Sequence, residues 1–307
     1  MKLPTSVILK KAYGKFGVPA FNVFNAEQIH GVLGGAETVD TPVIVQITPA
    51  ARNYINPEFL EGMITAGQDI YPAAVFSIHL DHGNIEHCIS ALESGFYNSV
   101  MIDASNEKFE KNISITSDIV KRAHDKGISV EAELGVLSGV EDDKNVSEEK
   151  SRYTDPDQVV EFVERTVCDF LAVAVGTSHG AYKMSGGKGL QLNILKEIQE
   201  RLPGFPIVLH GASNVPRQEV EEINRYGGKL KPTAAGVDEK ELLLAIKYGV
   251  TKVNIATDMR LIWARVHREF FNNSPELFDP VVPGKKYMEE LKLFVKQKCR
   301  SLIINQP

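Results

Sequence analysis

Short hydrophobic runs alternate with longer amphipathic stretches along most of the 307-residue chain. Runs of this length, closed by polar or glycine residues, are typical of buried strands. Eight strands are predicted, at residues 18–23, 42–47, 75–82, 99–105, 129–135, 170–176, 206–211 and 250–257. Apolar positions at helical spacing between them predict helices at 26–38, 57–68, 85–94, 113–126, 157–165, 192–202, 217–226 and 239–248.

Regular alternation of strand and helix implies parallel strands joined by crossover helices, and eight such repeats close a barrel. Two further amphipathic stretches, 259–271 and 286–302, follow the last strand. The fold class predicted is therefore α/β, a (β/α)8 TIM barrel with extra C-terminal helices, as a single domain over residues 1–307. A doubly wound open sheet is the alternative.

Polar residues at the carboxyl ends of almost all the predicted strands favour the barrel, because an open sheet concentrates them at one switch point. They are Asn22, Thr48, Asp81, His82, Asp103, Glu133, His179, His210, Asn254 and Thr257. Asp81 and His82 are adjacent on one strand, and strict alternation would direct them to opposite sides unless the strand already bends into its loop. One could then bind a metal while the other faces a substrate.

Three histidines, His82, His179 and His210, follow strands three, six and seven and should converge at one rim of a barrel. Imidazoles with a carboxylate suit Zn²⁺ or a similar ion such as Co²⁺. Asp103 and Glu133 lie between them in barrel order. A single histidine at a strand end is more often structural, but three on one rim favour a metal site.

Glycine-containing segments after strands six and seven, and the segment 254–257 at strand eight, expose backbone amides near a rim position where barrels often bind phosphate. With two hydroxyls and an ammonium group, they predict a phosphate site. The residues concerned are Gly180, Lys183, Gly211, Ala212, Ser213, Asn254, Ile255, Ala256 and Thr257.

The composition indicates which binding partners and which cellular compartment to expect. A formal net charge of −6 argues against nucleic-acid and membrane-surface partners, which normally meet a basic face. Three cysteines without metal-type spacing leave an odd thiol, so no disulfide framework is expected and a reducing cytoplasm fits. No run approaches membrane-spanning length.

Six strings resemble the class II, zinc-dependent ketose-bisphosphate aldolases, in order over nearly the whole chain. They are 78–83 (IHLDHG), 100–105 (VMIDAS), 129–135 (SVEAELG), 176–183 (GTSHGAYK), 208–213 (VLHGAS) and 252–254 (KVN). The resemblance implies reversible, metal-dependent aldol cleavage of fructose 1,6-bisphosphate to dihydroxyacetone phosphate and glyceraldehyde 3-phosphate, in glycolysis and gluconeogenesis. It also implies a cytoplasmic homodimer or homotetramer.

The family pattern assigns a role to each matching residue. His82, His179 and His210 become ligands of the catalytic zinc, and Asp103 with Glu133 a second or alternative divalent-metal position; a monovalent cation, Na⁺ or K⁺, is also implied. Asp81 and Glu141 become the catalytic acid–base residues, with Glu141 on a mobile loop over residues 141–153. The phosphate-site residues above would bind dihydroxyacetone phosphate, and Asn22 and Thr48 would border the substrate.

The sequence departs from the family pattern in the aldehyde half of the site. Fructose enzymes usually have Asp where this chain has Ala256, which resembles tagatose-bisphosphate aldolases instead. An expected arginine for the distal phosphate is replaced by Val281, with Lys285 or Lys286 as a substitute. A tagatose 1,6-bisphosphate or related ketose-phosphate aldolase is therefore an alternative. A metal-dependent barrel hydrolase and a scaffold with a structural zinc are alternatives of other classes.

Overall fold

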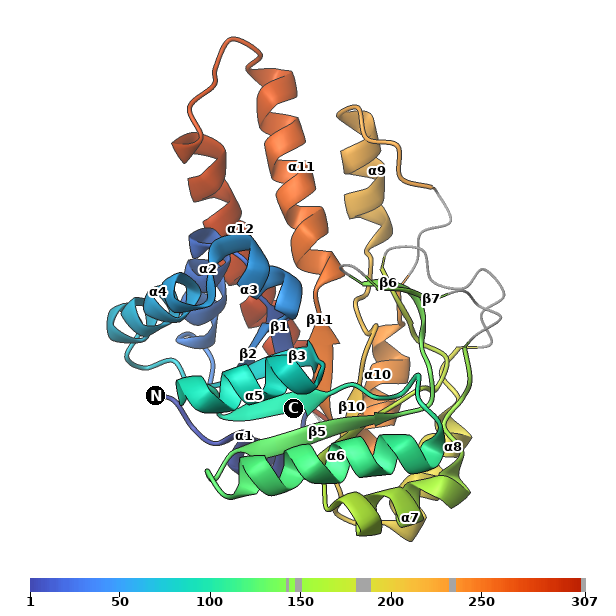
Figure 1. Ribbon diagram of the computed structural model, residues 1–307. Helices are drawn as coiled ribbons and strands as arrows, with labels where there is room; N and C mark the ends of the chain where they lie inside the picture. The colour runs from blue at the N-terminus through green and yellow to red at the C-terminus, as the bar shows by residue number, and fades with distance from the viewer. Residues whose placement is uncertain (142–143, 147–150, 181–188, 232–235, 305–307) are drawn as a thin grey trace.

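The computed structural model describes residues 1–141, 144–146, 151–180, 189–231 and 236–304. Eight parallel strands form a closed barrel in the order β1-β11-β10-β8-β5-β4-β3-β2 (Figure 1). Their bounds are β1 Val18–Asn22, β2 Val43–Ile47, β3 Phe76–Gly83, β4 Ser99–Ile102, β5 Ser129–Leu134, β8 Phe170–Val173, β10 Ile207–Leu209 and β11 Val250–Ile255. Seven of these strands lie within one predicted hydrophobic run each, and β3 extends one residue beyond its run, to Gly83, so the TIM barrel is confirmed.

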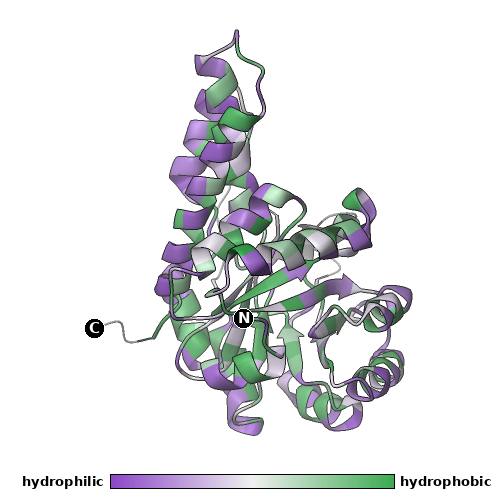
Figure 2. Cartoon of the chain, turned by 90° about the vertical axis from the view of Figure 1, so that its left-hand side faces the viewer, coloured by the Kyte–Doolittle hydropathy of each residue, from purple (hydrophilic) through white to green (hydrophobic). Residues whose placement is uncertain are grey.

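Helices cover the outside of the barrel and bury their apolar faces against it. They are α2 Ala26–Ala36, α4 Pro57–Ile70, α5 Ile85–Ser94, α6 Phe109–His124, α7 Pro156–Thr166, α8 Leu192–Arg201 and α10 Glu239–Lys247. Helix α9 Arg217–Arg225 instead packs Val220 and Ile223 against Leu261 of helix α11 Thr257–Asn273. Figure 2 shows hydrophobic residues mainly in the strands and on the helix faces turned toward them. Helix α6 begins earlier than predicted, at Phe109, whose ring packs 6.1 Å from that of Phe162.

The two extra C-terminal helices are α11 Thr257–Asn273 and α12 Val281–Ser301. They lie side by side, and their joined ends project from the barrel as an arm at the top of Figure 1. Helix α12 begins at Val281 instead of 286, and it also packs against α2. No helix among the described residues is long and apolar enough to cross a membrane.

Several elements were not predicted. The helix α1 Thr5–Ala12 packs Ile8 and Leu9 against inward-facing strand residues such as Val18 and so closes the amino-terminal end of the barrel. A short helix, α3 Pro49–Ile55, follows β2. The loop after β5 forms two strands, β6 Ser138–Glu141 and β7 Lys144–Val146, which join β9 Ser178–His179 in a separate three-stranded sheet.

Candidate active site

Three predicted residues meet at the carboxyl ends of the barrel strands. Asp81 and His82 come from the end of β3, and His210 follows β10. One ligand atom from each lies within 4.8 Å of the others, and all three residues are buried. The closest pair is His82 Nε2 and His210 Nδ1, 2.9 Å apart. The predicted convergence of strands three and seven is therefore found.

Asp81 and His82 reach the same point although they are neighbours in sequence, so strict alternation does not hold and the strand bends before its end. The pairing of β3 with β4 shifts register between Leu80 and Gly83, and His82 has a left-handed backbone with φ of 52°. Such a bulge re-aims a side chain. Gly83 is needed there because a Cβ would lie 3.0 Å from the Met101 carbonyl oxygen.

The Asp81 carboxylate is surrounded by amide donors. Asn22 Nδ2 donates to Oδ2 over 2.9 Å, Gln46 Nε2 approaches the same oxygen at 3.4 Å, and Asn254 Nδ2 approaches Oδ1 at 3.3 Å. Two amide oxygens beside it, Gln46 Oε1 and Asn254 Oδ1, are buried and have no hydrogen-bond partner in the described part of the chain. Buried acceptors normally have a hydrogen-bond partner, so these two oxygens could accept hydrogen bonds from substrate hydroxyls.

Asp103 and Glu133 lie on the other side of the His82 ring. Asp103 Oδ2 is 3.2 Å and Glu133 Oε2 is 3.9 Å from His82 Nδ1. Ser105 Oγ donates to Asp103 over 2.8 Å. His82, Asp103 and Glu133 also form a group whose ligand atoms lie within 4.8 Å of one another. The two carboxylates can therefore orient His82 or share a second cation with it.

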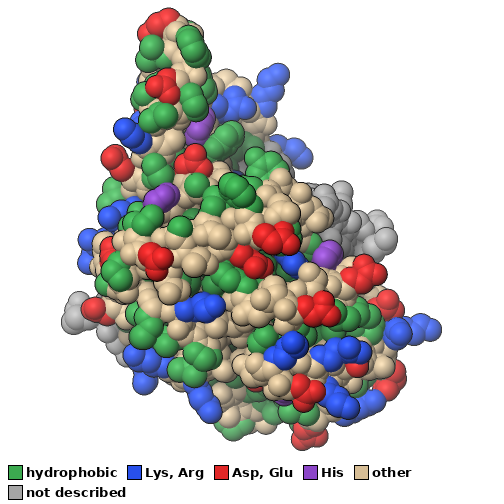
Figure 3. Space-filling view, turned by 60° about the vertical axis from the view of Figure 1, so that its left-hand side comes forward, with side chains coloured by type: hydrophobic (Ala, Val, Ile, Leu, Met, Phe, Trp, Pro, Cys, Tyr) green, Lys and Arg blue, Asp and Glu red, His purple; other side chains and the backbone are tan. Residues whose placement is uncertain are grey.

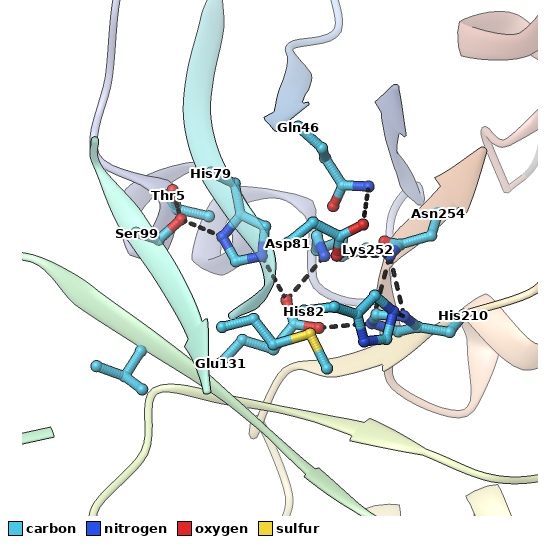
Figure 4. A network of polar contacts seen from close by, with 12 residues as sticks. Thr5, Gln46, His79, Asp81, His82, Ser99, Glu131, His210, Lys252 and Asn254 are labelled. Carbon is cyan, nitrogen blue, oxygen red and sulfur yellow. Dashed lines mark hydrogen bonds and ion pairs between the residues drawn. The ribbon is translucent and has the colours of Figure 1, made fainter. Parts of the chain in front are cut away.

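A layer of charge that the sequence analysis did not identify lies beneath this site (Figure 4). Glu131 accepts from His210 Nε2 over 2.7 Å and pairs with Lys252 Nζ at 2.8 Å and His79 Nε2 at 3.2 Å. All four side chains are fully buried. Burial favours the neutral acid, but Lys252 and the hydrogen bonds from His210 and His79 outweigh it and hold the pKa of Glu131 well below its ordinary value.

His210 is held neutral, as a metal ligand must be. Burial and the adjacent His82 lower its pKa, and Glu131 only partly opposes them. A sequence signal for the charged layer existed, since Glu131 and Lys252 each interrupt an apolar strand two residues before a predicted site residue, Glu133 and Asn254. Residues two apart on a strand face the same side.

The segment after β10 adjoins the beginning of α11. Ala256 N donates to Ser213 Oγ over 3.4 Å, and the Asp258 carboxylate accepts from the amides of Asn214 and Val215. Ala256 caps α11 without a side-chain hydrogen bond. The first amides of a helix are free to bind an anion. Thr48 caps α3 and, unlike Ala256, accepts a hydrogen bond with its side chain, from Ala51 N over 3.2 Å.

Several predicted residues lie outside the described part: Lys183 entirely, and the side chains of His179 and Glu141. Their neighbouring backbone is informative. Gly139 pairs with His179 in the small sheet, two residues before Glu141. A Cβ on Gly211 would lie 2.5 Å from Ser178 O, so the chain after His210 contacts the residue before His179. The backbone thus brings these segments to the site.

Of the predicted residues, those whose side chains the structure brings together are Asn22, Asp81, His82, Asp103, Glu133, His210 and Asn254. The side chains of Ala212 and Ile255 instead pack in the hydrophobic core, which leaves only their backbones to a ligand. Gly180 has a left-handed backbone with φ of 84°.

A divalent metal fits this arrangement. Two nitrogens bound to one tetrahedral zinc lie about 3.3 Å apart, given Zn–N distances of about 2.0–2.1 Å. The 2.9 Å between His82 Nε2 and His210 Nδ1 needs only a small opening. The donor set of two imidazoles and a carboxylate suits zinc or cobalt. Each imidazole also has a carboxylate at its other nitrogen, as metal-binding histidines usually do.

Comparison with known proteins agrees with this geometry. The family model "Fructose-bisphosphate aldolase class-II" matches residues 4–305. The chain is 40% identical over 300 residues to the "Fructose-bisphosphate aldolase class 2" of Synechocystis, covering 90% of this chain and 83% of that protein. It is 38% identical over 317 residues to the "Fructose-bisphosphate aldolase" of Treponema pallidum, covering 96% and 93%.

A solved structure extends the agreement to three dimensions. The YdjI aldolase from Escherichia coli K12 is 29% identical and superposes with a TM-score of 0.78, over 98% of this chain and 97% of that one. The barrel hydrolase and the non-catalytic scaffold find no support among these relatives. With a family match over nearly its whole length, and with the metal-binding geometry at its barrel mouth, the chain belongs to the class II fructose-bisphosphate aldolases, which are metal-dependent lyases.

Proposed function

We propose that this protein catalyses the reversible aldol cleavage of fructose 1,6-bisphosphate to dihydroxyacetone phosphate and glyceraldehyde 3-phosphate. The observation that carries the proposal is the meeting of Asp81, His82 and His210 at the mouth of the barrel, in a chain of this family. A hydroxyl-bearing substrate would find a carboxylate, two imidazoles and unsatisfied amide oxygens there.

The metal is proposed to be zinc, with cobalt as a substitute, held by His82, His210 and His179. Cleavage of the C3–C4 bond leaves an enediolate, whose negative charge a divalent cation stabilises as a Lewis acid. Asp103 and Glu133 are proposed to form a second or alternative cation position, because both face the far nitrogen of His82. A monovalent cation, Na⁺ or K⁺, is part of the same proposal.

Asp81 is proposed to take the proton from the C4 hydroxyl during cleavage and to return it during condensation. The amide groups of Asn22, Gln46 and Asn254 fix the carboxylate, so its orientation does not depend on the substrate. Glu141 is proposed to exchange the proton at the enediolate carbon. Its backbone lies in β6, which pairs with β9 and so with the segment that carries His179.

The phosphate of dihydroxyacetone phosphate is proposed to bind among three segments of the chain, two of which lie wholly in the described part. The backbone from Gly211 to Ser213 and the free amides at the beginning of α11, near Thr257, contact each other and supply donors. Gly180 and Lys183 would complete the cradle from the loop after β9.

The distal phosphate is proposed to enter a cavity of about 380 Å³ at the same end of the barrel. Its walls include Asn25, Ala50 and Arg260, which follow Asn22, Thr48 and Thr257 by only two or three residues. Arg260 stacks over the ring of Phe24 at 4.9 Å, which directs the guanidinium along the cavity wall.

Arg260 is therefore proposed to supply the cation that Val281 does not.

Ala256 favours a second candidate substrate, tagatose 1,6-bisphosphate, which differs from fructose 1,6-bisphosphate at C4. Ala256, the N-cap residue of α11, provides no carboxylate that could distinguish the two configurations at C4. Dihydroxyacetone phosphate is the product common to both sugars.

A place in glycolysis and gluconeogenesis, a cytoplasmic location and a homodimer or homotetramer complete the proposal. Exposed hydrophobic side chains on the projecting arm support an oligomer, since such patches often mark protein contacts (Figure 3). The arm exposes Trp263, Phe271, Leu277, Phe278, Val281 and Val282. Nucleic acid and membrane are not proposed as partners.

The test is to incubate the purified protein with each bisphosphate and to detect triose phosphate with a coupled dehydrogenase. Cleavage should stop after treatment with a chelator and return with zinc or cobalt. Borohydride added with substrate should leave the enzyme active, because no lysine imine is needed. Covalent trapping of triose on a lysine would contradict the proposed mechanism.

A further inference from the structure

The charged layer of Glu131, Lys252 and His79 has no role in the chemistry proposed above. Each of these side chains has 0% exposure, in the interior of the barrel. Burying an ion pair costs several kcal/mol of desolvation, and apolar residues of similar size are often as stable. Stability alone therefore does not explain why charges occupy this layer.

The contacts of Glu131 divide its two oxygens between different partners. Oε1 lies 2.7 Å from His210 Nε2, whereas Oε2 lies 2.8 Å from Lys252 Nζ and 3.2 Å from His79 Nε2. The lysine thus occupies one oxygen and leaves the other to His210. Figure 4 shows these contacts converging on Glu131 from separate strands.

These contacts determine which nitrogen of His210 faces the metal position. A carboxylate only accepts hydrogen bonds, so His210 Nε2 must carry the proton. A neutral imidazole has one protonated nitrogen, so Nδ1 is then the unprotonated nitrogen, the one that can bind a metal. Nδ1 points to His82 Nε2, 2.9 Å away, where the metal is expected.

We propose that Glu131 and Lys252 are positioning residues that set the tautomer and orientation of His210 for metal binding. The inference rests on the proposed function in one respect, namely that His82 and His210 are metal ligands. Lys252 acts through Glu131 and touches neither metal nor substrate. Its ammonium is fully buried in the ion pair, so it is also not available as an imine-forming nucleophile.

The variant Glu131→Gln tests the tautomer directly. The Lys252 ammonium can only donate hydrogen bonds, so the amide oxygen of the new glutamine should face Lys252. The amide NH₂ of the glutamine must then face His210 Nε2. His210 must then accept at Nε2 and carry its proton on Nδ1, which blocks the metal. Loss of such an outer partner typically weakens metal binding by ~10–100-fold.

A second substitution should reverse the effect. In Glu131→Gln with Lys252→Met, only His79 remains on that side, and a neutral imidazole can carry its proton on Nδ1, toward Ser99 Oγ, and accept at Nε2. The amide NH₂ can then face His79, and the amide oxygen can turn back to His210. The double variant should therefore bind zinc more tightly than Glu131→Gln alone. A merely structural role predicts the opposite, since two substitutions in a buried layer normally destabilise more than one.

Zinc affinity is measured on the metal-free full-length protein by competition with a chromophoric chelator, and the His210 tautomer by ¹⁵N NMR of labelled histidine. Lys298→Met is the matched control, because Lys298 is also buried but lies on α12. It should keep wild-type affinity. If the double variant does not fold, Glu131→Gln, which keeps size and shape, still decides.

Wild-type zinc affinity and an unchanged tautomer in Glu131→Gln would overturn the inference, as would a double variant that binds no better than Glu131→Gln. His82→Ala is measured beside them and separates the two hypotheses. If His82→Ala retains zinc, the proposed metal site is wrong. If it loses zinc while Glu131→Gln does not, the metal site stands and the positioning role fails.

Discussion

Replacing Gly211 by alanine should disturb the metal site through packing alone. Gly211 has φ of 60°, where a residue with a Cβ is strained by about 1–2 kcal/mol. Its Cβ would lie 2.5 Å from Ser178 O and 2.7 Å from Ser178 C, against backbone that cannot rotate away. Overpacking of this kind typically costs a further ~1–3 kcal/mol. The free energy of unfolding should fall by about 2–5 kcal/mol.

The matched control is Gly95→Ala. Gly95 has a similar φ of 67°, but its Cβ would meet nothing within 4 Å. It should lose only the ~1–2 kcal/mol of backbone strain. Zinc affinity should separate the variants as well, because relief of the clash moves Ser178, and with it His179, away from His210. Denaturant unfolding and chelator competition measure both quantities. Equal losses of stability in the two variants would refute the packing argument.

Three further predictions concern the chemistry. His82→Ala should lose tightly bound metal, whereas Glu141→Ala should keep it and turn over ~10²–10⁴-fold more slowly, as loss of a general acid–base residue implies. Metal content and kcat measured together check this prediction. Wild-type turnover in Glu141→Ala would exclude the assignment of Glu141 as the acid–base residue of the loop. Ala256→Asp should shift the ratio of kcat/KM toward fructose over tagatose bisphosphate, by about 5- to 150-fold if a hydrogen bond worth ~1–3 kcal/mol is gained; an unchanged ratio would mean that this position does not set the preference. Arg260→Met should raise KM for the bisphosphate with little change in the kinetics of dihydroxyacetone phosphate enolisation, and an equal effect on both would place the residue elsewhere in the mechanism.

The sequence was sufficient to predict the barrel because its signal is repetitive. Eight apolar runs at regular intervals have few arrangements that bury them all. Elements without such a signal were missed. Helix α1 is short. The polar strands β6 and β7 pair with each other, and β6 pairs with β9, which no local sequence pattern predicts.

The candidate site, like the fold, was predicted only in part. Polar residues at strand ends identified Asp81, His82 and His210, since the fold itself brings those ends together. Their relative orientation could not be predicted, because the bulge in β3 depends on the register with β4, a contact between strands. Glu131 and Lys252 were not predicted, because the site was predicted from polar residues at the ends of strands and these two residues lie within β5 and β11.

The closure of the barrel by α1 has a consequence for the order in which the molecule assembles. Thr5 Oγ1 lies 2.7 Å from Ser99 Oγ, and Ser99 Oγ lies 2.7 Å from His79 Nδ1, so the first helix contacts residues that are synthesised more than seventy positions later. An eight-residue helix is marginal on its own in water. Helix α1 must therefore wait for β3 and β4 to be synthesised before it can dock against them. Closure of this end of the barrel follows the formation of these two strands and does not precede it.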